Sequence, residues 1–254
     1  MRILITNDDG INAPGLKSLE HIARTLSDDI WIVAPEYDQS AVSHSLTVRT
    51  PFRITEVSQK KYFVSGTPTD CVLSAVQLLM KQKPDLVLSG VNNGSNLAED
   101  ITYSGTVAAA LEATQLGIPA IAFSLENEFP HPTKWATAEH WGPIVLKQIL
   151  NATIPKDILI NVNFPNVVHK SVEGIKVARQ GKHKLLDNIH KREDPRGIPY
   201  YWIGTGCQGY KELCKFAIEG TDVEAIVNKY ISITPISIDM TDDKTLEQLK
   251  GQFA

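Results

Sequence analysis

The amino-terminal segment constrains the fold of this chain more than any other feature. Residues 3–5 (Ile-Leu-Ile) and 30–34 (Ile-Trp-Ile-Val-Ala) are apolar runs, long enough for buried strands and too short for helices. Between them, Leu16, Leu19 and Ile22 recur at helical spacing. A strand, a helix and a second strand within about 35 residues form a βαβ unit, which requires a parallel sheet. The sequence therefore predicts an α/β fold.

The same alternation of elements continues along the chain. A β-ribbon is expected outside this alternation, over residues 48–57 and 62–64. Thr67, Pro68 and Asp70 have the spacing of a helix start with a capping box, and Gly117 suits a left-handed helix end. We predict further buried strands over 86–88, 118–123 and 158–162, and helices over 68–80, 107–116 and 140–150.

The pattern changes near residue 166, so we divide the chain into a catalytic core over 1–165 and a carboxyl-terminal segment over 166–254. This segment has a basic stretch, residues 182–196, before the aromatic run Tyr200-Tyr201-Trp202. We interpret this region as a basic loop between two aromatic strands, a protruding hairpin whose aromatic residues suit a subunit interface, with a solvated arm as the alternative. Strands over 171–180 and 230–235 and helices over 223–227 and 246–253 complete the prediction.

Composition excludes several classes of protein. The 254 residues carry a net charge of −4, which argues against non-specific binding to a nucleic-acid polymer. No apolar stretch approaches the length of a membrane span, and the start of the sequence lacks the apolar segment of a signal peptide. Cys71, Cys207 and Cys214 are odd in number and form no C-x-x-C motif. We therefore expect a cytoplasmic protein without a disulfide framework.

The first predicted strand ends in Asn7-Asp8-Asp9-Gly10. Two adjacent carboxylates at the carboxyl end of a buried strand repel each other and lose solvent together, a conflict that a cation resolves. Oxygen ligands favour a hard divalent ion such as Mg²⁺ or Mn²⁺. Taken alone, this stretch is equally compatible with a solvated turn before a helix.

Other polar residues converge on the same predicted edge. Ser40 follows the second strand and Asn92 follows the third, in a Gly/Asn-rich loop. We predict one divalent ion bound by Asp8, Asp9, Ser40 and Asn92. Two anionic and two neutral ligands leave the charge of the ion partly uncompensated, so that it can polarise a phosphoryl oxygen and acidify a water. Asp8 and Asp9 are therefore also the candidate catalytic residues.

Ser104, Gly105 and Thr106 supply the second requirement for phosphate chemistry. They open the predicted helix, where free N–H groups attract an anion, Gly105 permits close approach and the hydroxyls can donate. A plain helix cap is the alternative. Together with Asn96, at the end of the Gly/Asn-rich loop, they are our candidates for binding substrate and phosphate. A larger residue at 105 is expected to obstruct phosphate without disturbing a metal ligand.

Several familiar motifs are absent. No G-x-G-x-x-G, H-E-x-x-H or G-x-S-x-G occurs. A near P-loop over residues 10–18 fails because Leu16 displaces Lys17 by one position and Pro14 lacks an N–H. The sequence does not identify the general acid or base. Asp9 and His44 are weak candidates, and a surface role for His44 is the better interpretation.

The motifs together resemble the survival protein E (SurE) nucleotidases over essentially the whole chain. The resemblance implies a Rossmann-like three-layer core with a carboxyl-terminal arm exchanged within a homodimer or a dimer of dimers. It also implies metal-dependent hydrolysis of nucleoside 5′- and 3′-monophosphates, sometimes of short polyphosphate, with metal ligands at Asp8, Asp9, Ser40 and Asn92. The matching blocks are residues 7–10, 33–35 with 39–41, 66–72, 89–92, 103–107, 194–197, 200–204 and 232–235.

Three positions depart from the family pattern. Ser95 stands where Pro is usual, and Ala98 where Gly is common, so the loop near the substrate can differ in shape. Asn228 replaces a frequent Gly away from the predicted chemistry. Two other functions remain open: a sensor that binds a metal–nucleotide without hydrolysing it, and a transferase acting on a phosphorylated substrate. The missing glycine fingerprint argues against a dinucleotide enzyme.

Overall fold

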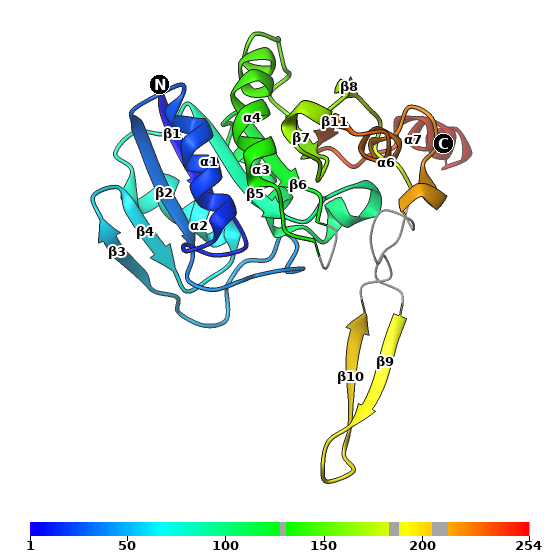
Figure 1. The fold of residues 1–254 in the computed structure, drawn as a ribbon, viewed down its shortest axis with the longest axis horizontal. Helices are drawn as coiled ribbons and strands as arrows, with labels where there is room; N and C mark the ends of the chain where they lie inside the picture. The colour runs from blue at the N-terminus through cyan, green and yellow to red at the C-terminus, as the bar shows by residue number, and fades with distance from the viewer. Residues whose placement is uncertain (128–130, 183–187, 205–212, 254) are drawn as a thin grey trace.

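A computed structural model describes residues 1–127, 131–182, 188–204 and 213–253. Within this part of the chain, nine strands form one sheet in the order β3-β4-β2-β1-β5-β6-β7-β11-β8 (Figure 1). Neighbouring strands from β4 to β7 are parallel, whereas β3 and β11 run antiparallel to β4 and β7. The predicted α/β class is confirmed. The strands are β1 (Arg2–Thr6), β2 (Asp29–Pro35), β3 (Ile54–Ser58), β4 (Lys61–Val64), β5 (Leu86–Asn93), β6 (Ala120–Leu125), β7 (Ile158–Phe164), β8 (Gly174–Val177) and β11 (Tyr230–Ser237).

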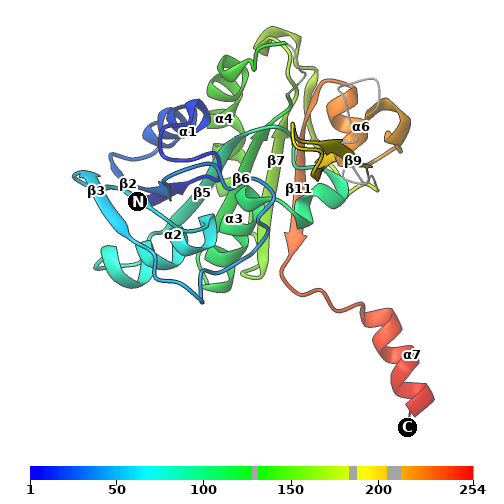
Figure 2. The same ribbon diagram turned by 90° about the horizontal axis from the view of Figure 1, so that it is seen from below.

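Helices cover both faces of the sheet and make three layers (Figure 2). On one face lie α1 (Pro14–Arg24) and α4 (Trp135–Leu150). On the other lie α2 (Pro68–Ser74), which continues as a π-helical turn over Ala75–Leu79, and α3 (Gly105–Gln115). Short 3₁₀ turns occur at η2 (Ala98–Thr102), η3 (His169–Ser171) and η4 (Cys214–Phe216). This arrangement is the predicted Rossmann-like core.

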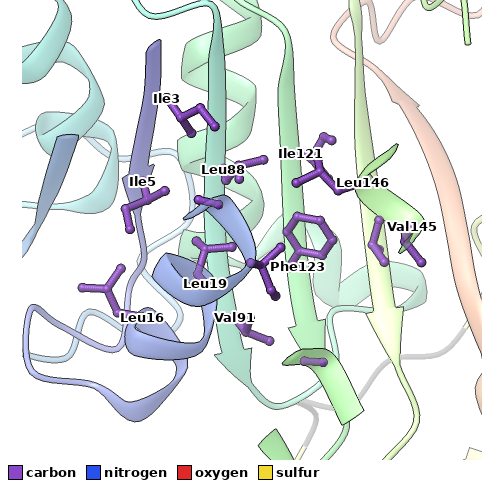
Figure 3. Close-up of a cluster of buried hydrophobic side chains, with 14 of the residues drawn as sticks. Ile3, Ile5, Leu16, Leu19, Leu88, Val91, Ile121, Phe123, Val145 and Leu146 are labelled. Atoms are coloured by element: carbon purple, nitrogen blue, oxygen red, sulfur yellow. The ribbon is translucent and has the colours of Figure 1, made fainter. Parts of the chain in front are cut away.

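Two hydrophobic cores result from the alternation of side chains along the strands. Ile3 and Ile5 point into the core beneath α1 and α4, where Leu19 packs (Figure 3). Leu4 points the opposite way and packs with Val107 of α3. Because successive residues of a strand face opposite sides, a strand buried on both faces must be apolar at every position. This explains the uninterrupted Ile-Leu-Ile run.

The two helix-capping signals read from the sequence are confirmed. Thr67 Oγ1 accepts a hydrogen bond from the Asp70 N–H, and the Asp70 carboxylate accepts one from the Thr67 N–H, so both halves of the capping box are present. At the end of α3, Gly117 has a φ of +76°, in the left-handed region that glycine occupies without penalty.

Several predicted boundaries were wrong. The ribbon is not separate from the alternating core, because β4 pairs with β2 in parallel and β3 extends the main sheet. β5 continues to Asn93, so much of the predicted Gly/Asn-rich loop is strand; its pairing with β6 shifts between Ser89 and Asn92. α4 begins at Trp135, five residues before the predicted start, and the strand expected over 171–180 is limited to Gly174–Val177.

The carboxyl-terminal residues both complete the sheet and project from it. β11 pairs with β7, so the main sheet crosses the predicted division at residue 165, which stays a prediction. A protruding hairpin is confirmed, and it extends away from the body (Figure 1). The basic segment was wrongly predicted as its loop, because residues of this segment form β9 (Asn188–Glu193), which pairs with β10 (Pro199–Gly204). Residues 183–187 of the basic segment and Cys207 lie outside the described residues.

The last two helices differ in their surroundings. α6 (Asp222–Val227) packs on β11, whereas α7 (Asp243–Phe253) buries none of its residues and lies apart from the body (Figure 2). None of the described helices is long and apolar enough to cross a membrane.

Candidate active site

The order of strands in the sheet reverses next to β1. The chain continues from β1 to β2 on one side and from β5 to β6 on the other, so the connections after the neighbouring strands β1 and β5 run in opposite directions. In open α/β sheets, ligands bind outside the strand ends at such a reversal of order. Asp8 and Asp9 follow β1, and Asn92 lies near the end of β5. Three of the four predicted metal ligands therefore lie at the expected position.

Asp8 packs against the first turn of α3. Its side chain is buried, and Thr106 Oγ1 donates a hydrogen bond to Asp8 Oδ1. A Cβ at Gly105 would lie 2.8 Å from Asp8 Cβ and 3.0 Å from Oδ2, so only glycine leaves room for this contact. The expectation that a larger residue at 105 would leave the predicted metal ligands undisturbed is wrong, because any side chain there meets Asp8.

The environment of Asp8 favours a neutral carboxyl group. Burial raises the pKa of Asp8 to about 7, with a smaller rise from the nearby charge of Asp9. The hydrogen bond from the Thr106 hydroxyl lowers the pKa in part, and the Thr106 backbone acts in the same direction. The pKa thus identifies a buried carboxyl group that lacks a compensating positive charge.

Asp9 lies nearer the surface and contacts the end of β5. Its Oδ2 accepts a hydrogen bond of 3.1 Å from the Asn93 N–H. Burial raises the pKa of Asp9, and the charge of Asp38 raises it further. Asp38 is an acidic neighbour of the site that the sequence reasoning missed. Its position two residues before Ser40, in the loop after β2, was the available signal.

The loop after β2 is tied directly to Asp8. The Gln39 N–H donates to the Asp8 carbonyl at 2.9 Å, and the Ser40 N–H donates to Asp38 Oδ1 at 2.7 Å. These bonds bring the backbone at Ser40 to the carboxyl end of the strands, where the site is predicted. Ser40 itself stays exposed. Asn92 Nδ2 donates to the Gly94 carbonyl at 2.9 Å, so the acceptor oxygen of this amide is the end left for a ligand.

This donor set fits a hard divalent cation. Two carboxylates, a hydroxyl and an amide oxygen come from three segments linked by the bonds above. In the described part of the chain, no group of three His, Cys, Asp or Glu residues is placed to hold a metal. A cation here would therefore depend on the neutral oxygens of Ser40 and Asn92. The buried carboxyl group of Asp8 lacks a compensating positive charge, and this would favour the binding of a cation.

The start of α3 can hold an anion with its backbone. Ser104 Oγ accepts from the Val107 N–H at 3.0 Å, and the Thr106 hydroxyl is directed to Asp8, so both hydroxyls have partners within the protein. The first N–H groups of a helix lack intrahelical acceptors and lie at the positive end of its dipole. The phosphate cradle predicted at Ser104, Gly105 and Thr106 would thus use backbone N–H groups more than hydroxyls.

Asn96 lies at the centre of a buried polar network. Its Nδ2 donates to Ser124 Oγ at 2.7 Å, and its N–H donates to Asn163 Oδ1 at 2.8 Å. Its carbonyl accepts from the side-chain amides of Asn161 and Asn163 at 2.8 and 3.1 Å. These bonds fix the loop after β5 to β7. A role for Asn96 in substrate binding stays a prediction.

His44 lies away from the carboxylates. Its Nε2 is 2.8 Å from Glu112 Oε2, and Glu112 lies seven residues beyond Gly105 in α3. That spacing corresponds to about 10 Å along a helix. The structure therefore does not bring His44 to Asp8, and the weak hypothesis that it acts as acid or base receives no support.

The backbone conformation at Ala98 explains why glycine is common at this position in the family pattern. Its φ of +49° lies in the left-handed region, where a Cβ is unfavourable and glycine is not. We predict that Ala98→Gly raises the free energy of unfolding by about 0.5–1 kcal/mol, the strain relief being partly offset by glycine's larger loss of entropy. Chemical denaturation of both proteins measures the change, and a destabilised variant would contradict it.

Comparison with known proteins gives a consistent result. The family model described as survival protein SurE matches residues 3–187. A protein of Paramagnetospirillum magneticum named 5′-nucleotidase SurE is 55% identical over 254 residues, covering 100% of this chain and 96% of the relative. The protein of that name from Parvibaculum lavamentivorans is 51% identical, covering 98% and 90%. The crystal structure of the SurE protein from Aquifex aeolicus is 40% identical with a TM-score of 0.83, covering 100% of both chains. Because the sequence matches extend over nearly the full length and the solved structure has the same fold, the chain belongs to the SurE family.

Proposed function

We propose that this protein is a metal-dependent 5′-nucleotidase that hydrolyses nucleoside 5′-monophosphates to nucleoside and phosphate. The relatives named 5′-nucleotidase SurE support the activity. Activity on 3′-monophosphates and on short polyphosphate is part of the proposal. The observation that carries it is the buried Asp8 carboxyl group packed against the first turn of α3, which would bring the proposed cation ligand next to the proposed phosphate site.

The residues at the site have distinct roles in this proposal. Asp8, Asp9, Ser40 and Asn92 would hold one divalent ion, Mg²⁺ or Mn²⁺. When bound, such an ion stabilises charge on phosphoryl oxygens and lowers the pKa of a water. The backbone N–H groups at Gly105 and Thr106 bind the phosphate and stabilise its developing charge. Thr106 also holds the Asp8 carboxylate in place through its hydroxyl.

Proton transfer is assigned to Asp9. As a carboxylate beside the proposed ion, Asp9 would lie within reach of a water bound there. Asn93 holds one oxygen of Asp9 and fixes its orientation. Asp9 would take the proton from the attacking water while the N–H groups of α3 hold the phosphate.

Phosphate release from a nucleotide panel tests the proposal. The protein should release phosphate from nucleoside 5′-monophosphates, lose this activity with a chelator and regain it with added Mg²⁺ or Mn²⁺. Ribose 5-phosphate and a dinucleotide serve as comparison substrates. Binding of nucleotide without phosphate release would indicate the sensor instead, and activity that survives complete chelation would contradict the metal.

We propose that the carboxyl-terminal segment assembles a homodimer or a dimer of dimers. On β10, Tyr201, Trp202 and Ile203 are 62%, 64% and 70% exposed, more apolar surface than a solvated hairpin needs. Leu246, Leu249 and Phe253 of α7 are also exposed. These surfaces lie on elements that project from the body (Figures 1 and 2). Contact with a second copy of the chain would bury both apolar surfaces.

Replacing residues 188–204 by a short Gly-Ser linker should lower the molar mass in light scattering. This deletion removes both hairpin strands and retains Gln180, whose side chain contacts the core loop. Circular dichroism of the variant should match the parent outside the lost strands. An unchanged mass would show that the hairpin is not required for assembly.

The cellular setting is also a proposal. An odd number of cysteines without a C-x-x-C motif supports a reducing compartment, and Cys71 is buried as a free thiol. The net charge of −4 supports small nucleotides over a nucleic-acid polymer as the partner. We propose a cytoplasmic enzyme without a membrane partner.

A further inference from the structure

Two side chains of the carboxyl-terminal segment bind the backbone of Ala98, in the loop after β5. The Ala98 N–H donates to Asp222 Oδ2 at 2.9 Å, and the Ala98 carbonyl accepts from Gln180 Nε2 at 2.8 Å. Asp222 belongs to α6, 124 residues further along the chain. Both polar groups of one core residue are thus bound by side chains from beyond the predicted catalytic core.

The surroundings of Asp222 fix its carboxylate in position for this contact. It is fully buried, and its Oδ1 accepts the Gly181 N–H at 2.8 Å and the Val223 N–H at 2.9 Å. A Cβ at Gly181 would lie 2.9 Å from Oδ1, so glycine lets the backbone approach the carboxylate. Each of the three N–H groups is bound by an oxygen of this carboxylate. One of these hydrogen bonds is lost only if a segment of the chain that carries them moves.

Apolar packing supports the same contact. Leu97 and Ala98 pack with Leu213, Val223 and Ile226 in a hydrophobic cluster distinct from the two cores of the sheet. Most of this cluster comes from α6 and the residue before η4. The loop is therefore enclosed by the carboxyl-terminal segment and does not lie free over the sheet.

A short rigid path leads from Ala98 to the start of α3. Ala98 opens η2, whose Asp100 carbonyl accepts the Tyr103 N–H at 3.0 Å and the Ser104 N–H at 3.1 Å. Ser104 then caps α3. On the other side, Asn96 is two residues away. A displacement of Ala98 would therefore shift residues on both sides of the predicted substrate site.

Ala98 needs this support more than an ordinary residue does. Its left-handed φ of +49° is unfavourable for a side chain with a Cβ, so the loop would relax from this conformation if released. Two hydrogen bonds and a hydrophobic cluster oppose that relaxation. Ala98 and the groups that hold it therefore lie together at the base of the loop.

We propose that Asp222 is a positioning residue for the nucleotidase reaction: by holding Ala98 it sets the placement of Asn96 and of the phosphate-binding start of α3. The inference rests on the proposed function. Because Asp222 Oδ1 also holds Gly181, which precedes the hairpin, one carboxylate connects the base of the projecting arm to the substrate loop.

Asp222→Asn tests the role with a minimal change of volume. An amide offers one acceptor oxygen, so its NH₂ group would face an N–H that the carboxylate now binds. We expect kcat/KM for a nucleoside 5′-monophosphate to fall about 10- to 100-fold, the range for a displacement of about 1 Å in a site. KM and the inhibition constant of free phosphate should both rise, which a mere loss of folded protein would not cause.

Asp70→Asn provides the matched control. Asp70 is also a buried carboxylate, and in the described part of the chain it accepts hydrogen bonds from Thr47 and from the Thr67 N–H at the start of α2, not from Ala98. Its substitution should lower the melting temperature and leave KM and phosphate inhibition near the parent values. Gln180→Leu with Asp222→Asn should cost less than the product of the single effects, since both residues hold Ala98.

The outcomes separate this inference from the proposed function. A parent protein that releases no phosphate from any nucleotide would refute the function itself. An active parent with Asp222→Asn within about threefold in kcat/KM would refute the positioning role. Equal changes in KM and phosphate inhibition for Asp222→Asn and Asp70→Asn would also refute it, because the effect would then be general destabilisation.

Discussion

Asp8→Asn is expected to abolish phosphate release and, at neutral pH, to make the protein more stable. The carboxyl group of Asp8 is buried against Gly105, and its pKa is raised to about 7. Without a cation, the folded protein must either protonate this group or keep a buried charge. Asparagine has nearly the same shape and carries no charge. It therefore removes a predicted metal ligand and an electrostatic cost together.

The gain in stability should depend on pH in a defined way. The pKa of Asp8 is about 7 in the folded protein, against an ordinary value of 3.8 for an aspartate. Between these values the folded state binds more protons than the unfolded state, so this group lowers stability as the pH rises. The penalty is absent below about pH 4 and complete above about pH 7, where it can reach about 4 kcal/mol.

Thermal unfolding of metal-free protein at pH 4, 6 and 8 measures this effect. The melting temperature of Asp8→Asn should exceed that of the parent most at pH 8 and least at pH 4. Added Mn²⁺ should stabilise the parent and not the variant. Asp70→Asn again serves as control, with a loss of stability and retained response to Mn²⁺. A variant that binds Mn²⁺ as the parent does would exclude Asp8 as a ligand.

The sequence was informative where one local pattern determines structure. The apolar run at residues 3–5 could only be a strand buried on both faces, and the polar residues Asp8 and Asp9 directly after it had to lie at the sheet edge. Thr67 was correctly placed as a helix cap because capping depends on residues within one turn. Ser104, for which a cap was the alternative interpretation, caps α3. The family resemblance then predicted that such separate motifs contribute to one site.

The sequence was less informative where distant segments decide the structure. Asn92 reads as a loop residue, yet β6 pairs with it and extends the strand. His44 reads as a polar residue near the sheet edge, yet Glu112 of α3 holds it elsewhere. The bond between Ala98 and Asp222 has no local signature at all, since it joins a backbone N–H to a carboxylate in another part of the chain. Such contacts follow from the packing of whole elements and not from spacing.

Gly105→Ala should cost about 10²–10³ in kcat/KM, although it adds only one methyl group. The new Cβ would lie 2.8 Å from Asp8 Cβ, a distance that real Cβ contacts essentially never show. Either Asp8 or the first turn of α3 must then move. Because Asp8 is a predicted metal ligand and the first turn carries the phosphate-binding N–H groups, both halves of the site are displaced relative to each other. Calorimetry should accordingly show weaker binding of Mn²⁺ and of phosphate.

The other end of the same helix supplies the control. Gly117 has a left-handed φ of +76° with no atom within 4 Å of its would-be Cβ, so Gly117→Ala strains the backbone without a clash. It should lower the free energy of unfolding by about 1–2 kcal/mol and leave kcat/KM near that of the parent. If Gly105→Ala also keeps activity within a few-fold of the parent, the start of α3 has only a structural role and phosphate binds elsewhere. A large loss at Gly105 beside a silent Gly117 would instead assign the effect to the contact with Asp8, because both variants make the same chemical change in the same helix.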